Sequence, residues 1–224
     1  MLLLLDLDNT LVDRAFAFNL WASDFVRLLG RSDSDSDTAW MIAADRDGYE
    51  PRESLAHAVE ERFKTGLSTE DLMERLLYDH VKFITLDSVI AAALRNARDS
   101  GWKIAIVTNG TTEQQTLKVQ TAGLETYVDA VIISEEQGVR KPETEIFEIA
   151  AAHLGMALAE GWMVGDHPAA DILGGRTAGL KTGWVSRGKS WPRELAAPDL
   201  SAHTAAEVID AVVRQHSGQL RFSS

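Results

Sequence analysis

The sequence predicts an α/β fold in which a mostly parallel sheet is flanked by helices and an all-helical segment is inserted after the first strand. Three observations indicate this fold. Residues 1–7 form a short aliphatic run that ends in polar residues, as in a strand buried on both faces of a parallel sheet. Residues 14–83 follow helical spacing, and later strand patterns alternate with helix patterns, as in βαβ units. We therefore expect a Rossmann-like core of residues 1–15 and 86–224, with residues 16–85 as a helical insert.

Apolar residues at helical spacing define the insert. The first predicted helix carries Phe18, Trp21 and Phe25 on one face and ends at Gly30, a residue type suited to helix C-termini. Residues 33–38 alternate Ser and Asp, and we expect a solvated loop there. The other predicted elements of the insert are a short helix at 40–44, a polar turn at 45–52, a helix marked by residues 55–63 and a helix at 68–81.

The core elements are predicted from aliphatic runs that alternate with helical segments. The first strand must join the later ones, because its backbone N–H and C=O groups need partners. Pro142 suits the first turn of a helix, so we expect it to open the helix that follows. We expect strands at 102–107, 128–133, 161–164 and 180–185, and helices at 87–98, 112–121, 144–154, 169–178 and 205–214.

Composition and charge exclude several classes of function. The chain has 224 residues, of which 45% are hydrophobic and 25% charged, as in ordinary globular proteins. Its net charge of −12 argues against a nucleic-acid or anionic-membrane partner, because both need basic surfaces. The absence of cysteine excludes disulfides and thiolate sites. The opening leucine run meets Asp6 too soon for a signal peptide or a membrane span, so we expect a cytoplasmic protein. The sequence leaves the oligomeric state open.

Two carboxylates follow the first predicted strand. Asp6 and Asp8 lie on the same side of the chain as it leaves the sheet, because strand residues alternate in direction. Ligands of open α/β sheets bind at the carboxyl ends of the strands. Like charges at close range resist joint ionisation, so a hard cation such as Mg²⁺ is expected between them. The alternative is that Asp6 only ends a strand and that Asp8 begins an ordinary polar turn.

Polar residues also follow the second and third predicted strands. Thr108 and Asn109 precede a helix, where a hydroxyl group and backbone N–H groups can bind an anion. The alternative is a simple N-cap turn, which would explain Thr111 or Thr112 equally well. Lys141 can place an ammonium group in the same crevice, although a surface position is the usual one for lysine.

Two more acids follow the fourth predicted strand. Asp166 can complete a cation site with Asp6 and the main-chain carbonyl of Asp8. Asp171 can accept hydrogen bonds from metal-bound waters, or it can be an acid favoured by the dipole in a first helical turn. Because the carboxyl ends of parallel strands meet at one edge, we expect all of these groups to gather there.

Together these segments resemble the haloacid dehalogenase superfamily of phosphohydrolases. The resemblance covers nearly the whole chain, and the insert resembles the cap of the subgroup that includes phosphoglycolate phosphatase-like enzymes. Asn9 and His167 stand where many members have glycine and serine or threonine, which leaves the choice of substrate open. The matching motifs are Asp6-Leu7-Asp8-Asn9-Thr10-Leu11, Thr108-Asn109-Gly110, Lys141-Pro142 and Gly165-Asp166 through Asp171.

The resemblance implies a Mg²⁺-dependent phosphatase that acts on a small phosphorylated metabolite. It implies that Asp6 is a nucleophile that forms an aspartyl-phosphate and that Asp8 exchanges protons with the leaving group and with water. The acid at position 8 favours phosphorus chemistry, because dehalogenases of the superfamily generally lack it. The implied phosphate-binding residues are Thr108, Asn109 and Lys141, and the implied metal ligands are Asp6, Asp8 and Asp166, with Asp171 behind them.

Two alternatives and the substrate stay open. A phosphosugar mutase of the β-phosphoglucomutase type carries the same motifs, and a non-catalytic regulatory protein can keep the fold. The polar turn of the insert is the best candidate for a specificity loop, through Arg46, Tyr49 and Arg52. Either arginine can pair with a carboxylate or a second phosphate, or it can form a solvated ion pair with neighbouring acids.

Overall fold

The computed structural model describes residues 1–31 and 34–221. The chain divides into two compact units. Met1–Val12 and Leu86–Ser224 form one, which we call the sheet unit, and Asp13–Thr85 form the other, which we call the helical unit. The described part of the chain contains no helix that is both long enough and apolar enough to cross a membrane.

A parallel six-stranded sheet forms the centre of the sheet unit, which confirms the predicted fold class. The strand order is β3-β2-β1-β4-β5-β6, so the first strand lies in the middle. The sixth strand was not predicted, because it is only three residues long and carries no apolar run. The strands are β1 Leu2–Leu5, β2 Lys103–Thr108, β3 Ala130–Ile133, β4 Trp162–Gly165, β5 Lys181–Val185 and β6 Leu200–Ala202.

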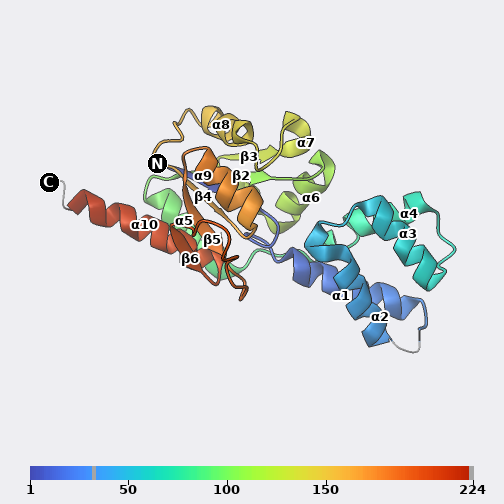
Figure 1. Ribbon diagram of the computed structural model, residues 1–224. Helices are drawn as coiled ribbons and strands as arrows, with labels where there is room; N and C mark the ends of the chain where they lie inside the picture. Colours follow the sequence, from blue (N-terminus) through green and yellow to red (C-terminus); the bar gives the residue numbers. More distant parts are fainter. Residues whose placement is uncertain (32–33, 222–224) are drawn as a thin grey trace. The chain divides into compact units, whose positions relative to one another are not determined.

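Helices cover both faces of the sheet. Helices α8 and α9 pack on one face, whereas α5 and α10 pack together on the other (Figure 1). The helices of the sheet unit are α5 Ser88–Asp99, α6 Thr112–Ala122, α7 Ser134–Gln137, α8 Thr144–His153, α9 Gly174–Thr177 and α10 Ala205–Arg221.

One local prediction for the sheet unit was wrong, and a second was right about helical structure but not about its form. Pro142 does not open a helix, because α8 begins at Thr144 with Glu143 as its N-cap residue. The helix predicted at 169–178 is divided into a π-helical turn, Pro168–Leu173, and the short α9. The division falls at Gly174. A Cβ there would lie 2.9 Å from the Cα of Pro142, so the close approach of these two backbone segments requires glycine.

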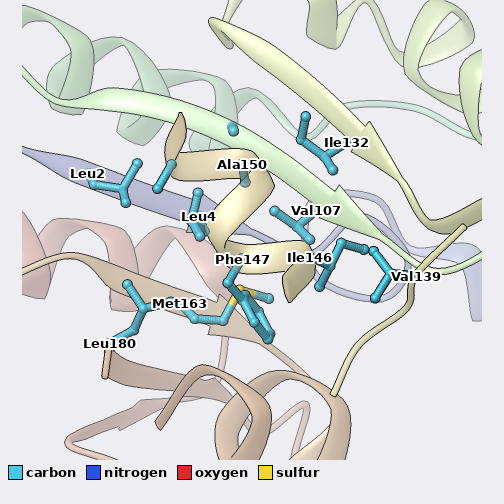
Figure 2. Close-up of a cluster of buried hydrophobic side chains, with 12 residues drawn as sticks. Leu2, Leu4, Val107, Ile132, Val139, Ile146, Phe147, Ala150, Met163 and Leu180 are labelled. Carbon is cyan, nitrogen blue, oxygen red and sulfur yellow. The ribbon is translucent and has the colours of Figure 1, made fainter. Parts of the chain in front are cut away.

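Strand β1 is buried on both faces, as its unbroken leucine run predicts. Leu2 and Leu4 point toward the face covered by α8, where they meet Phe147, and Met163 of β4 joins the same cluster (Figure 2). Leu3 and Leu5 alternate with them and are equally buried. Each buried leucine contributes roughly 1.5–3 kcal/mol to folding, so this strand anchors the residues that follow it.

Four main helices form the helical unit: α1 Arg14–Leu28, α2 Ser34–Asp45, α3 Arg52–Phe63 and α4 Thr69–Tyr78. Short 3₁₀ turns at Arg46–Gly48 and Val81–Phe83 accompany them. Their apolar faces form a separate core that includes Phe18, Trp21 and Leu55. Ser68 caps α4, because its hydroxyl accepts a hydrogen bond from the backbone N–H of Asp71 at 3.0 Å.

The loop predicted over residues 33–38 was wrong for residues 34–38, which open α2, while Asp33 lies outside the described residues. Asp37 is buried rather than solvated. Its carboxylate accepts from Arg31 at 2.9 Å and from Arg62 at 2.8 Å. Acidic residues also suit the first turn of a helix, where they face the positive end of the helix dipole. Tertiary ion pairs therefore convert a polar segment into a helix.

Candidate active site

Three carboxylates converge at the carboxyl edge of the sheet. Asp6 directly follows β1, and Asp166 directly follows the adjacent strand β4. Asp171 lies in the π-helical turn after β4. One oxygen from each of the three lies within 4.8 Å of the others, and among the described residues this is the group that could hold a metal ion. We call it the acidic cluster.

Lys141 bridges two members of the acidic cluster. Its Nζ lies 2.6 Å from Asp6 Oδ1 and 2.7 Å from Asp171 Oδ1, and the residue is only 3% exposed. Asn109 holds the backbone of this lysine, because its Nδ2 donates to the Lys141 carbonyl at 2.9 Å and its Oδ1 accepts from the Lys141 N–H at 2.9 Å. The loop after β2 thus fixes where the ammonium group sits.

The charges of the acidic cluster are not balanced. Burial raises the pKa of Asp6 to about 7, although Lys141 opposes the shift. Burial, with the charges of Asp6 and Asp171, raises the pKa of Asp166 to about 8. Burial lowers the pKa of Lys141, but Asp171 and Asp6 outweigh it and hold that pKa above its usual value. Lys141 is the ammonium group within the cluster, and the Arg187 guanidinium lies 3.6 Å from Asp166. Three converging acids favour an added hard cation, and their oxygen ligands fit Mg²⁺.

The geometry around Asp171 explains why glycine precedes Asp166. A Cβ at Gly165 would overlap the carboxylate of Asp171. That carboxylate also accepts from the backbone N–H of His167 at 2.9 Å, which orients it toward Lys141. Burial lowers the pKa of the His167 side chain, whose Nδ1 accepts from the backbone N–H of Ala170. The turn after β4 is therefore built around Asp171.

The carboxylate of Asp8 is held separately from the acidic cluster. Lys118 Nζ donates to both of its oxygens, at 2.9 and 2.7 Å. Gln115 Nε2 donates to Asp8 Oδ2 at 3.0 Å and to Thr108 Oγ1 at 2.6 Å. Asp8 still lies close enough for its charge to raise the pKa of Asp6. The predicted role of the Asp8 main-chain carbonyl as a metal ligand stays a prediction.

Two backbone N–H groups shortly after β2 donate to side chains of the α7 segment. The N–H of Gly110 donates to Ser134 Oγ at 3.0 Å, and that of Thr112 donates to Glu135 Oε2 at 2.7 Å. Thr111 caps α6, because its side chain accepts from the N–H of Gln114. The N-cap interpretation of this segment therefore applies to Thr111, one residue after the motif.

Lys118 and Gln115 were missed by sequence reasoning. Both are buried on α6, together with Val119, while Leu117 is exposed. A spacing of three and four residues does place these positions on one helical face, and that was the available signal. Arg187, after β5, was missed too; its Nη1 lies 3.6 Å from Asp166 Oδ2, and no motif marks it.

The predicted specificity residues belong to the helical unit. Arg46 forms an exposed ion pair with Glu50 at 3.4 Å, and Tyr49 is 57% exposed. Arg52 donates to the buried carboxylate of Asp45 at 2.8 Å. Arg52 therefore forms an ion pair within its own unit.

Comparisons with known proteins find phosphatases. A phosphoserine phosphatase of Thermus thermophilus is 39% identical over 117 residues, which cover 52% of this chain and 47% of that protein. An N-acylneuraminate-9-phosphatase of Rattus norvegicus is 27% identical over 206 residues, which cover 84% of this chain and 83% of that protein. The chain spans about half the length of the curated relatives it matches at higher identity.

The crystal structure of a HAD phosphatase from Thermococcus onnurineus matches with a TM-score of 0.64 and 26% identity, covering 94% of this chain and 96% of that one. A family model described as haloacid dehalogenase-like hydrolase matches residues 1–179. Because this match spans most of the chain, the protein belongs to the haloacid dehalogenase-like hydrolases.

Proposed function

We propose that this protein is a Mg²⁺-dependent phosphatase that hydrolyses a small phosphate monoester through an aspartyl-phosphate on Asp6. The proposal rests chiefly on the buried bridge that Lys141 makes between Asp6 and Asp171, beside Asp166. The two curated relatives described above are named as phosphatases, which supports the substrate class.

Each step of the proposed reaction uses a side chain of the sheet unit. Asp6 attacks phosphorus, which divides one difficult displacement into two easier ones. Lys141 and Thr108 bind the phosphoryl oxygens and stabilise the charge that they carry in the transition state. Asp8 gives a proton to the leaving alkoxide and later accepts one from the attacking water. Asn109 contributes by holding the backbone of Lys141.

The acidic cluster supplies the proposed Mg²⁺ site. Asp6 and Asp166, with the main-chain carbonyl of Asp8, would hold the ion, and Asp171 would stay paired with Lys141 behind them. When bound, the ion supplies positive charge that lets an anionic carboxylate approach an anionic phosphate. The raised pKa values of Asp6 and Asp166 support this site, because burial and neighbouring carboxylates cause them and a bound cation would offset both effects.

We also propose that the helical unit acts as a cap that selects the substrate. Tyr49 is exposed, and Arg46 forms a long ion pair at the surface, so either side chain is accessible to a ligand. Arg52 was a third candidate, but its contact with Asp45 supports a structural role more than substrate contact.

The test measures phosphate release from a panel of small phosphate monoesters, including sugar phosphates, phosphoglycolate and nucleoside monophosphates, with Mg²⁺ and with a chelator. We expect Mg²⁺-dependent release, and Asp6→Asn should lower it by roughly three orders of magnitude or more. Asp24→Asn, which removes an exposed carboxylate, is the matched control. Near-normal release by Asp6→Asn would exclude Asp6 as the nucleophile. Isomerisation of a sugar 1-phosphate without phosphate release would favour the mutase instead.

A further inference from the structure

Two buried side chains of α6, Gln115 and Lys118, donate hydrogen bonds to the carboxylate of Asp8. We propose that Lys118 and Gln115 are positioning residues that fix the orientation in which the Asp8 carboxylate exchanges a proton with the leaving group. This inference rests on the proposed function, because it takes Asp8 as the acid–base residue.

The first argument is the pairing of the buried Lys118 ammonium group with Asp8 and Gln115. Lys118 is 2% exposed, and a buried ammonium group destabilises the fold unless it is paired. Lys118 Nζ donates to Asp8 Oδ1, to Asp8 Oδ2 and, at 2.8 Å, to Gln115 Oε1. A lysine has three N–H donors, so these acceptors match them in number. An ammonium group bound in this way restricts the rotation of the Asp8 carboxylate.

The second argument is the orientation of the Gln115 amide. An ammonium group can only donate, so the side-chain oxygen of Gln115 must face Lys118. Its NH₂ group then faces Asp8 Oδ2 and Thr108 Oγ1. Because Thr108 Oγ1 accepts this bond, its own hydroxyl hydrogen points to a different acceptor. One amide therefore orients both the proposed acid and a proposed phosphate ligand.

The third argument is the space left for Gln115. A Cβ at Gly110 would lie 2.9 Å from the Gln115 side chain, so it would push that side chain out of its present position. The side chain of Asp8 keeps an exposed fraction of 24%, so it remains accessible while Lys118 and Gln115 hold it. The loop after β2, α6 and the segment after β1 thus fit together around Asp8.

A purely structural role for Lys118 makes a different experimental prediction. An alkyl phosphate loses a strongly basic alkoxide and needs the proton of Asp8, whereas 4-nitrophenyl phosphate loses a stable phenolate and needs little help. If a substitution of Lys118 acts through Asp8, it must therefore lower kcat/KM mainly for the alkyl substrate. A loss of folded protein lowers both rates equally, so the ratio of the two kcat/KM values is independent of the folded fraction.

The experiment compares kcat/KM for an alkyl phosphate and for 4-nitrophenyl phosphate in the full chain with Mg²⁺. We expect Lys118→Met to lower the alkyl value by about 100-fold, within the range of general acid catalysis, and the aryl value by less than about threefold. Gln115→Leu should shift the ratio in the same direction. Gln120→Met, an exposed position on the same helix, should leave the ratio unchanged.

A second arm introduces Lys118→Met into Asp8→Asn. If Lys118 acts through Asp8, the double variant should lose no more alkyl activity than Asp8→Asn alone. Additive losses, an equal fall for both substrates, or a faster alkyl reaction in Lys118→Met would each overturn the inference. If the unaltered chain releases phosphate from neither substrate, the proposed function is contradicted as well. If the unaltered chain is active and one of the outcomes above is found, only the inference about Lys118 and Gln115 fails.

Discussion

Asp45 is an almost inaccessible carboxylate of the helical unit, with 1% of its surface exposed. Arg14 Nη2 and Arg52 Nη1 each donate to Asp45 Oδ1 at 2.8 Å. Burial raises the pKa of Asp45, but the hydrogen bonds and charges of the two arginines outweigh it and hold the pKa below its usual range. The ionised form is therefore part of the folded state.

We expect Asp45→Asn to lower the free energy of unfolding by roughly 3–5 kcal/mol near pH 7, because two arginines lose their buried partner. The folded pKa lies below the unfolded value, so the stabilisation is present above about pH 4 and is lost as the pH falls through the folded pKa. The difference in the free energy of unfolding between Asp45→Asn and the unaltered chain should therefore become smaller at acidic pH. Denaturant titrations followed by circular dichroism at several pH values measure this.

The exposed pair of Asp24 with Arg27 supplies the control for that measurement. Asp24→Asn should change stability by no more than about 1 kcal/mol at any pH. If the loss of unfolding free energy in Asp45→Asn stays the same down to acidic pH, the carboxylate charge of Asp45 does not stabilise the helical unit.

Strand β1 carries the core of the sheet unit because both of its faces are covered. Leu4 packs with Val107, Phe147 and Met163 on the face of α8 (Figure 2). We expect Leu4→Ala to lower the free energy of unfolding by roughly 2–5 kcal/mol, since the close-packed neighbours can fill the cavity only in part. Thermal and urea unfolding check the value.

Leu28→Ala is the comparison for Leu4→Ala. Leu28 lies on α1 with 81% of its surface exposed, so its truncation should stay within about 0.5 kcal/mol. Equal losses for the two substitutions would mean that burial of β1 does not stabilise the fold.

The sheet as a whole gathers acidic residues at one edge, and we therefore expect the stability of the fold to depend on cations. Folding raises the pKa values of Asp6 and Asp166 to about 7 and about 8. The folded state then binds more protons than the unfolded chain between about pH 4 and pH 8, so without a cation these groups destabilise the fold as the pH rises through that window.

We expect Mg²⁺ to raise the Tm of the chelator-treated protein, and to raise it more at pH 8 than at pH 5.5, because the carboxylates bind the ion only when they are ionised. Differential scanning calorimetry measures the shift without relying on activity. Asp166→Asn should remove most of it. An equal shift at both pH values, or a full shift in Asp166→Asn, would contradict the proposed cation site.

The sequence alone was enough to predict five of the six strands of the parallel sheet and its longer helices, because hydrophobic periodicity reports directly on which faces are buried. The order of the motifs also places Asp6, Lys141 and Asp166 after separate strands, and parallel topology brings such ends to one edge. Local predictions failed where a distant contact decided the outcome. Residues 34–38 are an example, since Asp37 is held by Arg31 and Arg62.

Only the tertiary structure decided which polar groups meet. Whether Lys118 is a solvated lysine or a buried partner of Asp8 depends on the rotation of α6 about its own axis within the sheet unit, and local sequence does not specify that rotation. The pairing of Asp171 with Lys141 likewise depends on a turn built around Gly165 and His167. The sequence by itself determined the fold class and the residues able to take part in binding or catalysis, because these follow from periodicity and residue type. The pairing and pKa values of those residues follow from distances and burial, which exist only in the folded chain.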